Sequence, residues 1–112
     1  MSCTCGQDHA PAEIPRPDPA PGQMVVSGRL ICRSPDDLLT VIEMLPAHIA
    51  ASRAEPGCLY FDITQTDDPM IWRVEELYTD RDALGAHKER TAASPWAEAT
   101  AGIGRELSVT GG

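Results

Sequence analysis

The sequence predicts a single α+β domain in the order β-α-β-β-α-β, with helices on one face of a four-stranded antiparallel sheet, the ferredoxin-like arrangement. Strand-like runs near residues 24–33, 58–65 and 70–78 alternate with helical runs that begin at capping residues. The chain has 112 residues, which is room for one domain. Because such a sheet leaves its second face bare, we expect a second copy of the chain to cover it, giving a homodimer.

Residues 1–22 are expected to be a disordered tail, and residues 23–112 the folded domain. The tail contains five of the ten prolines, Pro11, Pro15, Pro17, Pro19 and Pro21. Each proline fixes φ and lacks an N–H, so the tail favours extended, solvated chain. Cys3, Cys5 and His9 suggest a metal site, but the spacing is too tight for a zinc knuckle and a fourth ligand is missing. No metal site is therefore predicted.

The formal net charge of −8 disfavours nucleic acid, because phosphate binding needs clustered Lys and Arg. It also disfavours an anionic membrane surface. No apolar run is long enough to span a bilayer, and the N-terminus lacks the basic and apolar regions of a secretory signal. A cytoplasmic location is the default expectation. Two cysteines in the tail, with Cys32 and Cys58 in predicted strands, do not form a disulfide framework.

The first helix begins after Ser34, whose hydroxyl can cap it, with Pro35 in a position that tolerates proline. Its apolar residues are expected to form one stripe: Leu38, Val41, Ile42, Leu45 and Ile49. His48 is expected on an exposed face of this helix. Glu55-Pro56-Gly57 ends it.

The two central strands form a predicted hairpin joined by a turn at residues 66–69. In the second of them one face carries Trp72, Val74, Glu76 and Tyr78. In the first strand Phe61 and Tyr60 face opposite ways. Asp80 then caps a helix that carries His87. Helix restarts at Ser94-Pro95, with Trp96, Thr100, Ile103 and Leu107 roughly in line, before a short strand at residues 107–110.

The stretch Arg53-Ala54-Glu55-Pro56-Gly57-Cys58-Leu59-Tyr60 closely resembles the "R-x-E-P-G-C-L-x-Y/F" stretch that closes the first helix of antibiotic-biosynthesis-monooxygenase domains. In that family a strand ending in Glu, a polar residue and an aromatic leads to a helical His eleven positions after the Glu. Glu76, Tyr78, Leu84 and His87 match this order. The resemblance covers about residues 24–110.

The resemblance implies a dimeric α+β barrel with a pocket between each sheet and its helices. The best-understood members of the family oxygenate quinols or polycyclic phenols without metal, flavin or haem, while others isomerise small signalling molecules or degrade haem. The expected partners are thus a small aromatic substrate and molecular oxygen, with no cofactor. Family members often carry a second His in a "T/S-P-H-F" stretch, where this chain has Trp96. The last-helix His of the haem-degrading branch is missing, which disfavours haem degradation.

His87 is the candidate general base, since a neutral imidazole can take a phenolic proton near neutral pH. Glu76 could orient it or hold a substrate hydroxyl. The alternatives are a His87 that merely fills space, bonded to a backbone carbonyl, and a Glu76 that is a buried acid paired with Arg73 or Arg53. The candidate substrate contacts are Trp72, Tyr78, Phe61, Leu84, Trp96 and Tyr60, although aromatic residues in so small a domain can simply be core.

These residues predict a cofactor-independent monooxygenase of a small quinol-like or phenolic compound. Two alternatives stay open: a non-catalytic dimer that binds or detoxifies a small molecule, and an isomerase acting on a small carbonyl metabolite. No glycine-rich phosphate loop or Ser-His-Asp order is present, so no nucleotide cofactor is implied.

Overall fold

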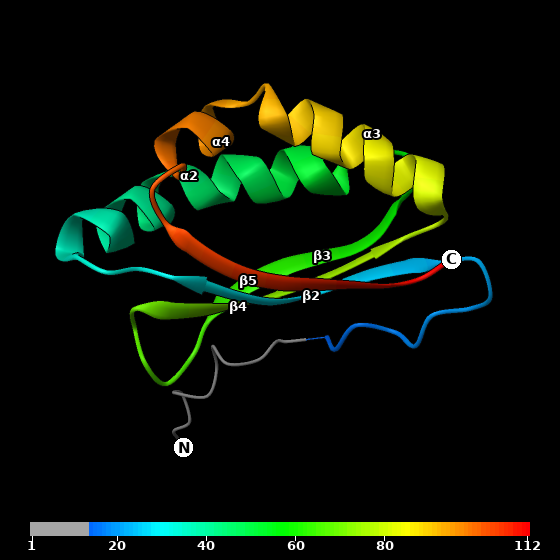
Figure 1. Cartoon of the computed structure of the whole chain (residues 1–112), viewed down its shortest axis with the longest axis horizontal. Coiled ribbons are helices and arrows are strands. Elements are labelled where there is room, and N and C mark those ends of the chain that lie inside the picture. The colour runs from blue at the N-terminus through cyan, green and yellow to red at the C-terminus, as the bar shows by residue number, and fades with distance from the viewer. Residues whose placement is uncertain (1–13) are drawn as a thin grey trace, which may run out of the picture.

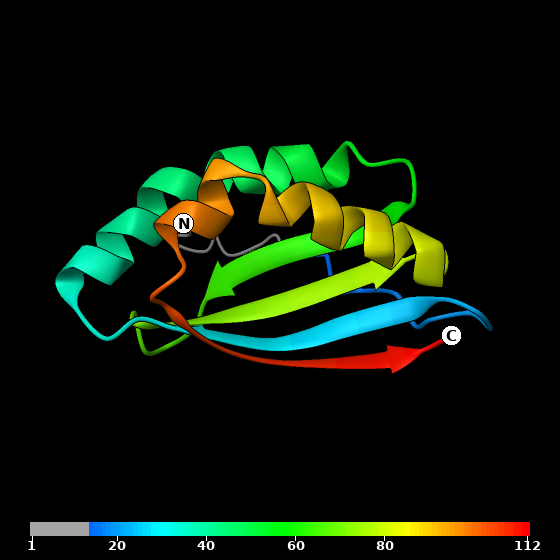
Figure 2. The same cartoon turned by 45° about the horizontal axis from the view of Figure 1, so that its top comes forward.

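The structure, a computed structural model, describes residues 14–112. Its elements are β2 (Met24–Ile31), α2 (Pro35–Arg53), β3 (Cys58–Gln65), β4 (Ile71–Tyr78), α3 (Arg81–Ala92), α4 (Pro95–Ala99) and β5 (Gly104–Gly111). The strands form one antiparallel sheet in the order β3-β4-β2-β5, and all three helices lie on one face of it (Figures 1 and 2). The predicted α+β, ferredoxin-like arrangement is confirmed.

Helix α2 begins as its sequence predicts, because the Ser34 hydroxyl accepts a hydrogen bond from the Asp37 N–H at 3.1 Å. Its most buried residues are Val41, Leu45, His48 and Ser52. They are spaced four, three and four positions apart, which places them on one face of a helix. Ile42 is 49% exposed, so the predicted stripe was wrong at that position. Successive residues of an α-helix are about 100° apart around its axis, so Ile42 points away from the buried face on which Val41 lies.

The last part of the domain departs from the prediction. Helix α4 ends at Ala99, and β5 begins at Gly104 and pairs with β2 along its full length. Leu107 lies in a strand, as predicted for residues 107–110, but that strand begins earlier, and Leu107 is not in line with Trp96 on a helix. The pairing is close at Gly28, where an added Cβ would lie 1.9 Å from the Glu106 carbonyl oxygen. A side chain at that position would push β5 away from the sheet.

The core lies between the sheet and the helices. Its larger cluster joins Leu30, Cys32, Val41, Leu45, Phe61, Ile63, Trp72, Val74, Trp96 and Ile103. A smaller cluster joins Met24, Val26, Tyr78 and Leu84. Cys32 is buried, Cys58 is half-buried, and both are free thiols packed with apolar neighbours.

The opposite face of the sheet is contacted by residues 14–22, which run beneath it in Figure 1 and contain no helix or strand. Arg16 Nε donates to Glu75 Oε1 at 3.0 Å, and the Tyr60 hydroxyl donates to the Ile14 carbonyl at 2.6 Å. The segment just before β2 is thus tied to the outer face of the sheet by polar contacts.

Cys3, Cys5 and His9 lie outside the described residues, so the expectations for them, and for a disordered tail over residues 1–22, stay predictions. In the range 14–112 no helix is long and apolar enough to cross a membrane.

Candidate active site

A cavity of about 430 Å³ lies between the sheet and the helices. All seven elements contribute to its lining. The residues are Val26 and Leu30 of β2, His48 of α2, Ile63 of β3, Val74 and Glu76 of β4, Leu84, His87, Lys88, Thr91 and Ala92 of α3, Trp96 and Ala97 of α4, and Arg105, Leu107 and Val109 of β5. Most of these side chains are apolar. The polar ones are His48, Glu76, His87, Lys88, Thr91 and Arg105, so the cavity suits an aromatic ligand with a few polar atoms.

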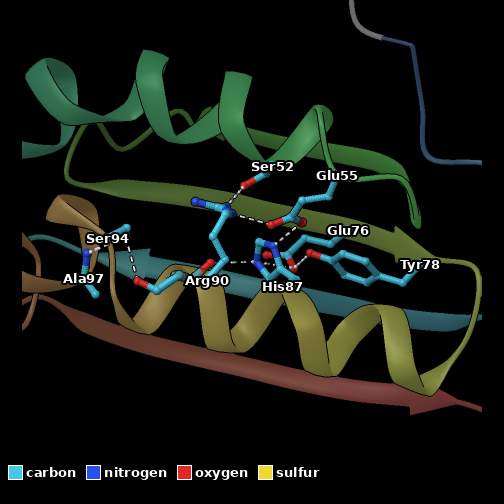
Figure 3. A network of polar contacts seen from close by, with 9 residues as sticks. Ser52, Glu55, Glu76, Tyr78, His87, Arg90, Ser94 and Ala97 are labelled. Carbon is cyan, nitrogen blue, oxygen red and sulfur yellow. Dashed lines mark hydrogen bonds and ion pairs between the residues drawn. The ribbon is translucent and has the colours of Figure 1, made fainter.

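His87 contacts the Glu55 carboxylate, which Arg90 holds in place (Figure 3). Its Nδ1 lies 2.8 Å from Glu55 Oε1, while Arg90 Nε donates to Glu55 Oε2 and Arg90 Nη2 donates to the Ser52 hydroxyl at 3.0 Å. Burial acts against the charged form of Glu55. The hydrogen bonds from Arg90 and His87 outweigh it and hold the pKa of Glu55 below its usual value.

An ionised Glu55 fixes the proton of a neutral His87 ring on Nδ1, because a carboxylate can only accept a hydrogen bond there. The lone pair then lies on Nε2. This nitrogen is 3.3 Å from the Thr91 hydroxyl and 3.8 Å from Glu76 Oε1, and the ring lines the cavity. His87 is thus oriented as a hydrogen-bond acceptor toward a ligand.

Glu76 lines the same cavity from β4, so it lies on the face of the sheet that packs against the helices. The Tyr78 hydroxyl donates to its Oε1 at 2.6 Å, and neither arginine weighed in the sequence analysis reaches it: Arg53 pairs with Asp62 instead, at 3.6 Å. Burial raises the pKa of Glu76, despite the Tyr78 hydrogen bond. Burial, with the neighbouring Glu76 charge, also raises the pKa of Tyr78, which therefore stays a neutral donor.

His48 was expected on an exposed face of the first helix, and that expectation was wrong. The ring is 6% exposed and lies flat against Trp96, with ring centroids 4.6 Å apart and planes within 3°. Phe61 meets its edge at 5.3 Å, and the His87 ring lies 6.2 Å away. Burial, followed by the charges of Arg90 and His87, lowers the pKa of His48 to about 4, so the ring is neutral at pH 7.

Neither ring nitrogen of His48 forms a hydrogen bond within residues 14–112, and Nδ1 is sealed from solvent. A buried polar atom without a partner is costly, and such atoms are concentrated at functional sites. The spacing Val41-Leu45-His48-Ser52 carried the signal that could have placed His48 in this site from the sequence.

The predicted contact residues separate into three groups. Trp96 and Leu84 line the cavity. Phe61 and Tyr78 pack against the His87 ring, with centroids 5.5 and 5.1 Å away, and support it from behind.

Trp72 and Tyr60 lie elsewhere. Trp72 belongs to the core cluster, and its Nε1 finds no partner in the described part of the chain. Tyr60 borders a separate hollow of about 400 Å³ that Ile14 also borders, away from the cavity. The alternation of β3 explains this position, because Tyr60 points opposite to its neighbour Phe61. Its predicted substrate contact has no support in this arrangement.

The comparisons with known proteins agree with this fold. A family model described as antibiotic biosynthesis monooxygenase matches residues 31–99. A Nitrosomonas europaea protein described as a candidate antibiotic biosynthesis monooxygenase superimposes with a TM-score of 0.71 at 27% identity, over 83% of this chain and 92% of that one. Rv0793 of Mycobacterium tuberculosis gives a TM-score of 0.64 at 26% identity, over 80% and 94%.

MupZ of Pseudomonas fluorescens shares the fold, with a TM-score of 0.70 at 19% identity over 88% of this chain and 74% of that one. No curated protein matches the sequence significantly. Among residues 14–112, no group of three or more His, Cys, Asp or Glu side chains is placed to hold a metal ion.

Proposed function

The chain belongs to the antibiotic biosynthesis monooxygenase family, and from that premise we propose that it is a cofactor-independent monooxygenase of a small quinol-like or phenolic compound. One observation carries the proposal: the contact between Glu55 and His87 Nδ1 leaves Nε2 as an acceptor in an apolar cavity. In the proposed complex the substrate hydroxyl donates a hydrogen bond to this nitrogen.

In the proposed reaction the phenolic proton moves to His87 Nε2, and the ionised Glu55 balances the charge of the imidazolium. The electron-rich phenolate passes one electron to molecular oxygen, and the two radicals combine to form a C–O bond as a ring hydroperoxide. Loss of water from the hydroperoxide leaves a carbonyl. The balance is phenol plus O₂ giving quinone plus water, with all four electrons coming from the substrate and the proton on His87 leaving with the water.

Glu76 supports this chemistry from the other side of Nε2. Its raised pKa means that it keeps its proton to higher pH than an exposed carboxyl does, so a protonated Glu76 can protonate the developing hydroperoxide. The neutral His48 ring, flat on Trp96, supplies an aromatic wall for the substrate.

The test is oxygen uptake by purified protein against a panel of hydroquinones and naphthoquinols, with autoxidation subtracted. His87→Ala is expected to lose at least about tenfold in rate, the low end for a lost general base. Glu89→Ala, an exposed change two positions along α3, is the matched control and should keep the wild-type rate. Equal uptake by folded His87→Ala would remove His87 from the mechanism.

The position and raised pKa of Glu76 favour a second candidate function, that of an isomerase acting on a small carbonyl compound. A carboxyl of raised pKa lies 3.8 Å from the histidine that would act as base, and such a pair can move a proton between carbons beside a carbonyl. Loss of a carbonyl substrate under nitrogen would identify this activity. Saturable binding of an aromatic ligand without oxygen use or substrate loss would indicate a binding protein instead.

We further propose that the working state is a cytoplasmic homodimer. Leu107 and Val109 of the edge strand β5 line the cavity, yet each is 45% exposed, so a partner could cover apolar surface at this margin. Light scattering should give about twice the chain mass of 12.0 kDa. A stable monomer at micromolar concentration would contradict the proposal.

A further inference from the structure

We infer that the ligand of this cavity is an aromatic acid whose carboxylate binds between Lys88 and Arg105. The inference rests on the proposed function for the phenolic end of the ligand and adds a second, anionic end to it. The base His87 is 6% exposed at the inner part of the cavity, whereas both cations are exposed at its margin. A ligand that spans the cavity would therefore reach both groups.

Both cations lack an acidic partner. Lys88 of α3 and Arg105 of β5 line the cavity, and within residues 14–112 neither forms an ion pair with a carboxylate. The one acid in the lining, Glu76, is bonded to Tyr78 and directed at His87. In a chain with a net charge of −8, two cations that form no ion pair with a carboxylate in residues 14–112 lie beside an apolar cavity and favour an anionic ligand.

Arg105 is fixed in place by neutral oxygens. Its Nη1 donates to the carbonyls of Thr100 and Ile103 at 3.1 and 3.5 Å, and its Nη2 donates to the Thr100 hydroxyl at 2.8 Å. Thr100 is fully buried and bonds in turn to the Trp96 carbonyl at 2.7 Å. The guanidinium is therefore anchored to the end of α4, next to the residue that forms the aromatic wall.

These bonds position the guanidinium without neutralising it. A guanidinium has five N–H groups, so three bonds to neutral oxygens leave two donors and the full charge for a ligand. Desolvation without a counter-charge lowers the pKa of Arg105, which agrees with an incomplete site. Lys88 is next to His87 on α3. Its flexible side chain can bring the ammonium group to the carboxylate from the other side of the cavity.

The test uses two ligands that differ only in charge, 6-hydroxy-2-naphthoic acid and its primary amide, whose hydroxyl and acid groups lie at opposite ends. Binding to the full-length protein is measured under nitrogen by calorimetry and by tryptophan fluorescence. The acid is expected to bind at least about tenfold tighter than the amide, since hydrogen bonds to charged groups are roughly twice as strong as neutral ones. This preference should shrink as salt concentration rises.

Arg105→Gln should remove most of the preference, because it weakens binding of the acid more than binding of the amide, and Arg105→Lys should restore part of it. Arg73→Gln, on the outer face of β4, is the matched control. If Arg105→Gln does not fold, the inference is tested with Lys88→Gln and with the salt dependence of the wild type. The Lys88 side chain forms no hydrogen bond within the described residues, so its replacement breaks none in the fold.

Equal affinity for acid and amide, no binding of the acid, or a preference that survives both variants would overturn the inference. None of these results depends on oxygen. The uptake assay with neutral quinols tests the proposed function separately, so either idea can fail without the other.

Discussion

Glu55 and His87, 32 positions apart in the sequence, meet between the end of α2 and the middle of α3, with Glu55 Oε1 2.8 Å from His87 Nδ1. Glu55 follows the last turn of α2, and Arg90, one turn beyond His87 on α3, holds its other oxygen. The contact ties His87 to the end of the first helix and leaves Nε2 on the side of the ring away from Glu55.

Glu55→Gln is expected to lower kcat by about tenfold or more with little change in KM, because the altered group orients the base and does not bind substrate. The amide can still accept from Nδ1–H, but it loses the charge that selects one tautomer. ¹⁵N NMR of labelled histidine should show one His87 tautomer in the wild type and a mixture in the variant. Glu43→Gln, exposed on α2, is the control; an unchanged kcat with a single tautomer in Glu55→Gln would contradict a positioning role.

Glu76→Gln separates the proposed catalytic role of Glu76 from its effect on stability. The pKa of Glu76 is raised in the fold, so the charged form is disfavoured there and the wild type loses stability as pH rises through that pKa. The variant cannot ionise and keeps an oxygen for the Tyr78 hydroxyl. It should therefore be more stable than wild type by about 1 kcal/mol or more at pH 8, with the difference shrinking toward pH 5.

Urea unfolding at both pH values measures this difference, and oxygen uptake on the same samples measures the chemistry. A slower but more stable Glu76→Gln is the expected result. If the variant is less stable than wild type at pH 8, the charged carboxylate is a stabilising group and the proton-donor role loses its basis.

Gly57→Ala should disturb the site through the backbone. A Cβ at residue 57 would lie 2.4 Å from the Ala83 Cβ, so the loop after Glu55 and the start of α3 must separate. Overpacking of this kind costs about 1–3 kcal/mol, and the Glu55–His87 contact should loosen with it.

The matched control is Gly85→Ala within α3, where an added Cβ meets nothing within 4 Å. Alanine there should leave stability equal or up to about 1 kcal/mol higher. Thermal unfolding and oxygen uptake are measured on both variants. Full activity in Gly57→Ala would show that this close packing does not hold the site together.

Local patterns placed His87 and Glu76 correctly in the fold, because caps, alternation and spacing are properties of short segments. Glu55 was interpreted as part of a helix stop and of the stretch that carries the resemblance, but not as a site residue. Its partner lies 32 positions away, and a local pattern cannot predict that contact. Glycines at positions 102 and 104 favour an early end to the last helix, yet apolar residues at helical spacing concealed the start of β5. Arg105 was overlooked for the same reason.

His48 should make the protein less stable in mild acid. In the unfolded chain His48 has its usual pKa of 6.5, whereas burial lowers its pKa in the folded protein to about 4. Between these two pKa values His48 is protonated in the unfolded state and neutral in the folded state. The free energy of unfolding therefore falls as the pH drops from 6.5 to about 4, and His48 does not change it above that range. The loss is at most about 3 kcal/mol, at about 1.4 kcal/mol per pH unit. Urea unfolding of wild type and His48→Gln from pH 7.5 to 4.5 should give a shallower curve for the variant; parallel curves would mean that the folded protein accepts the proton on His48.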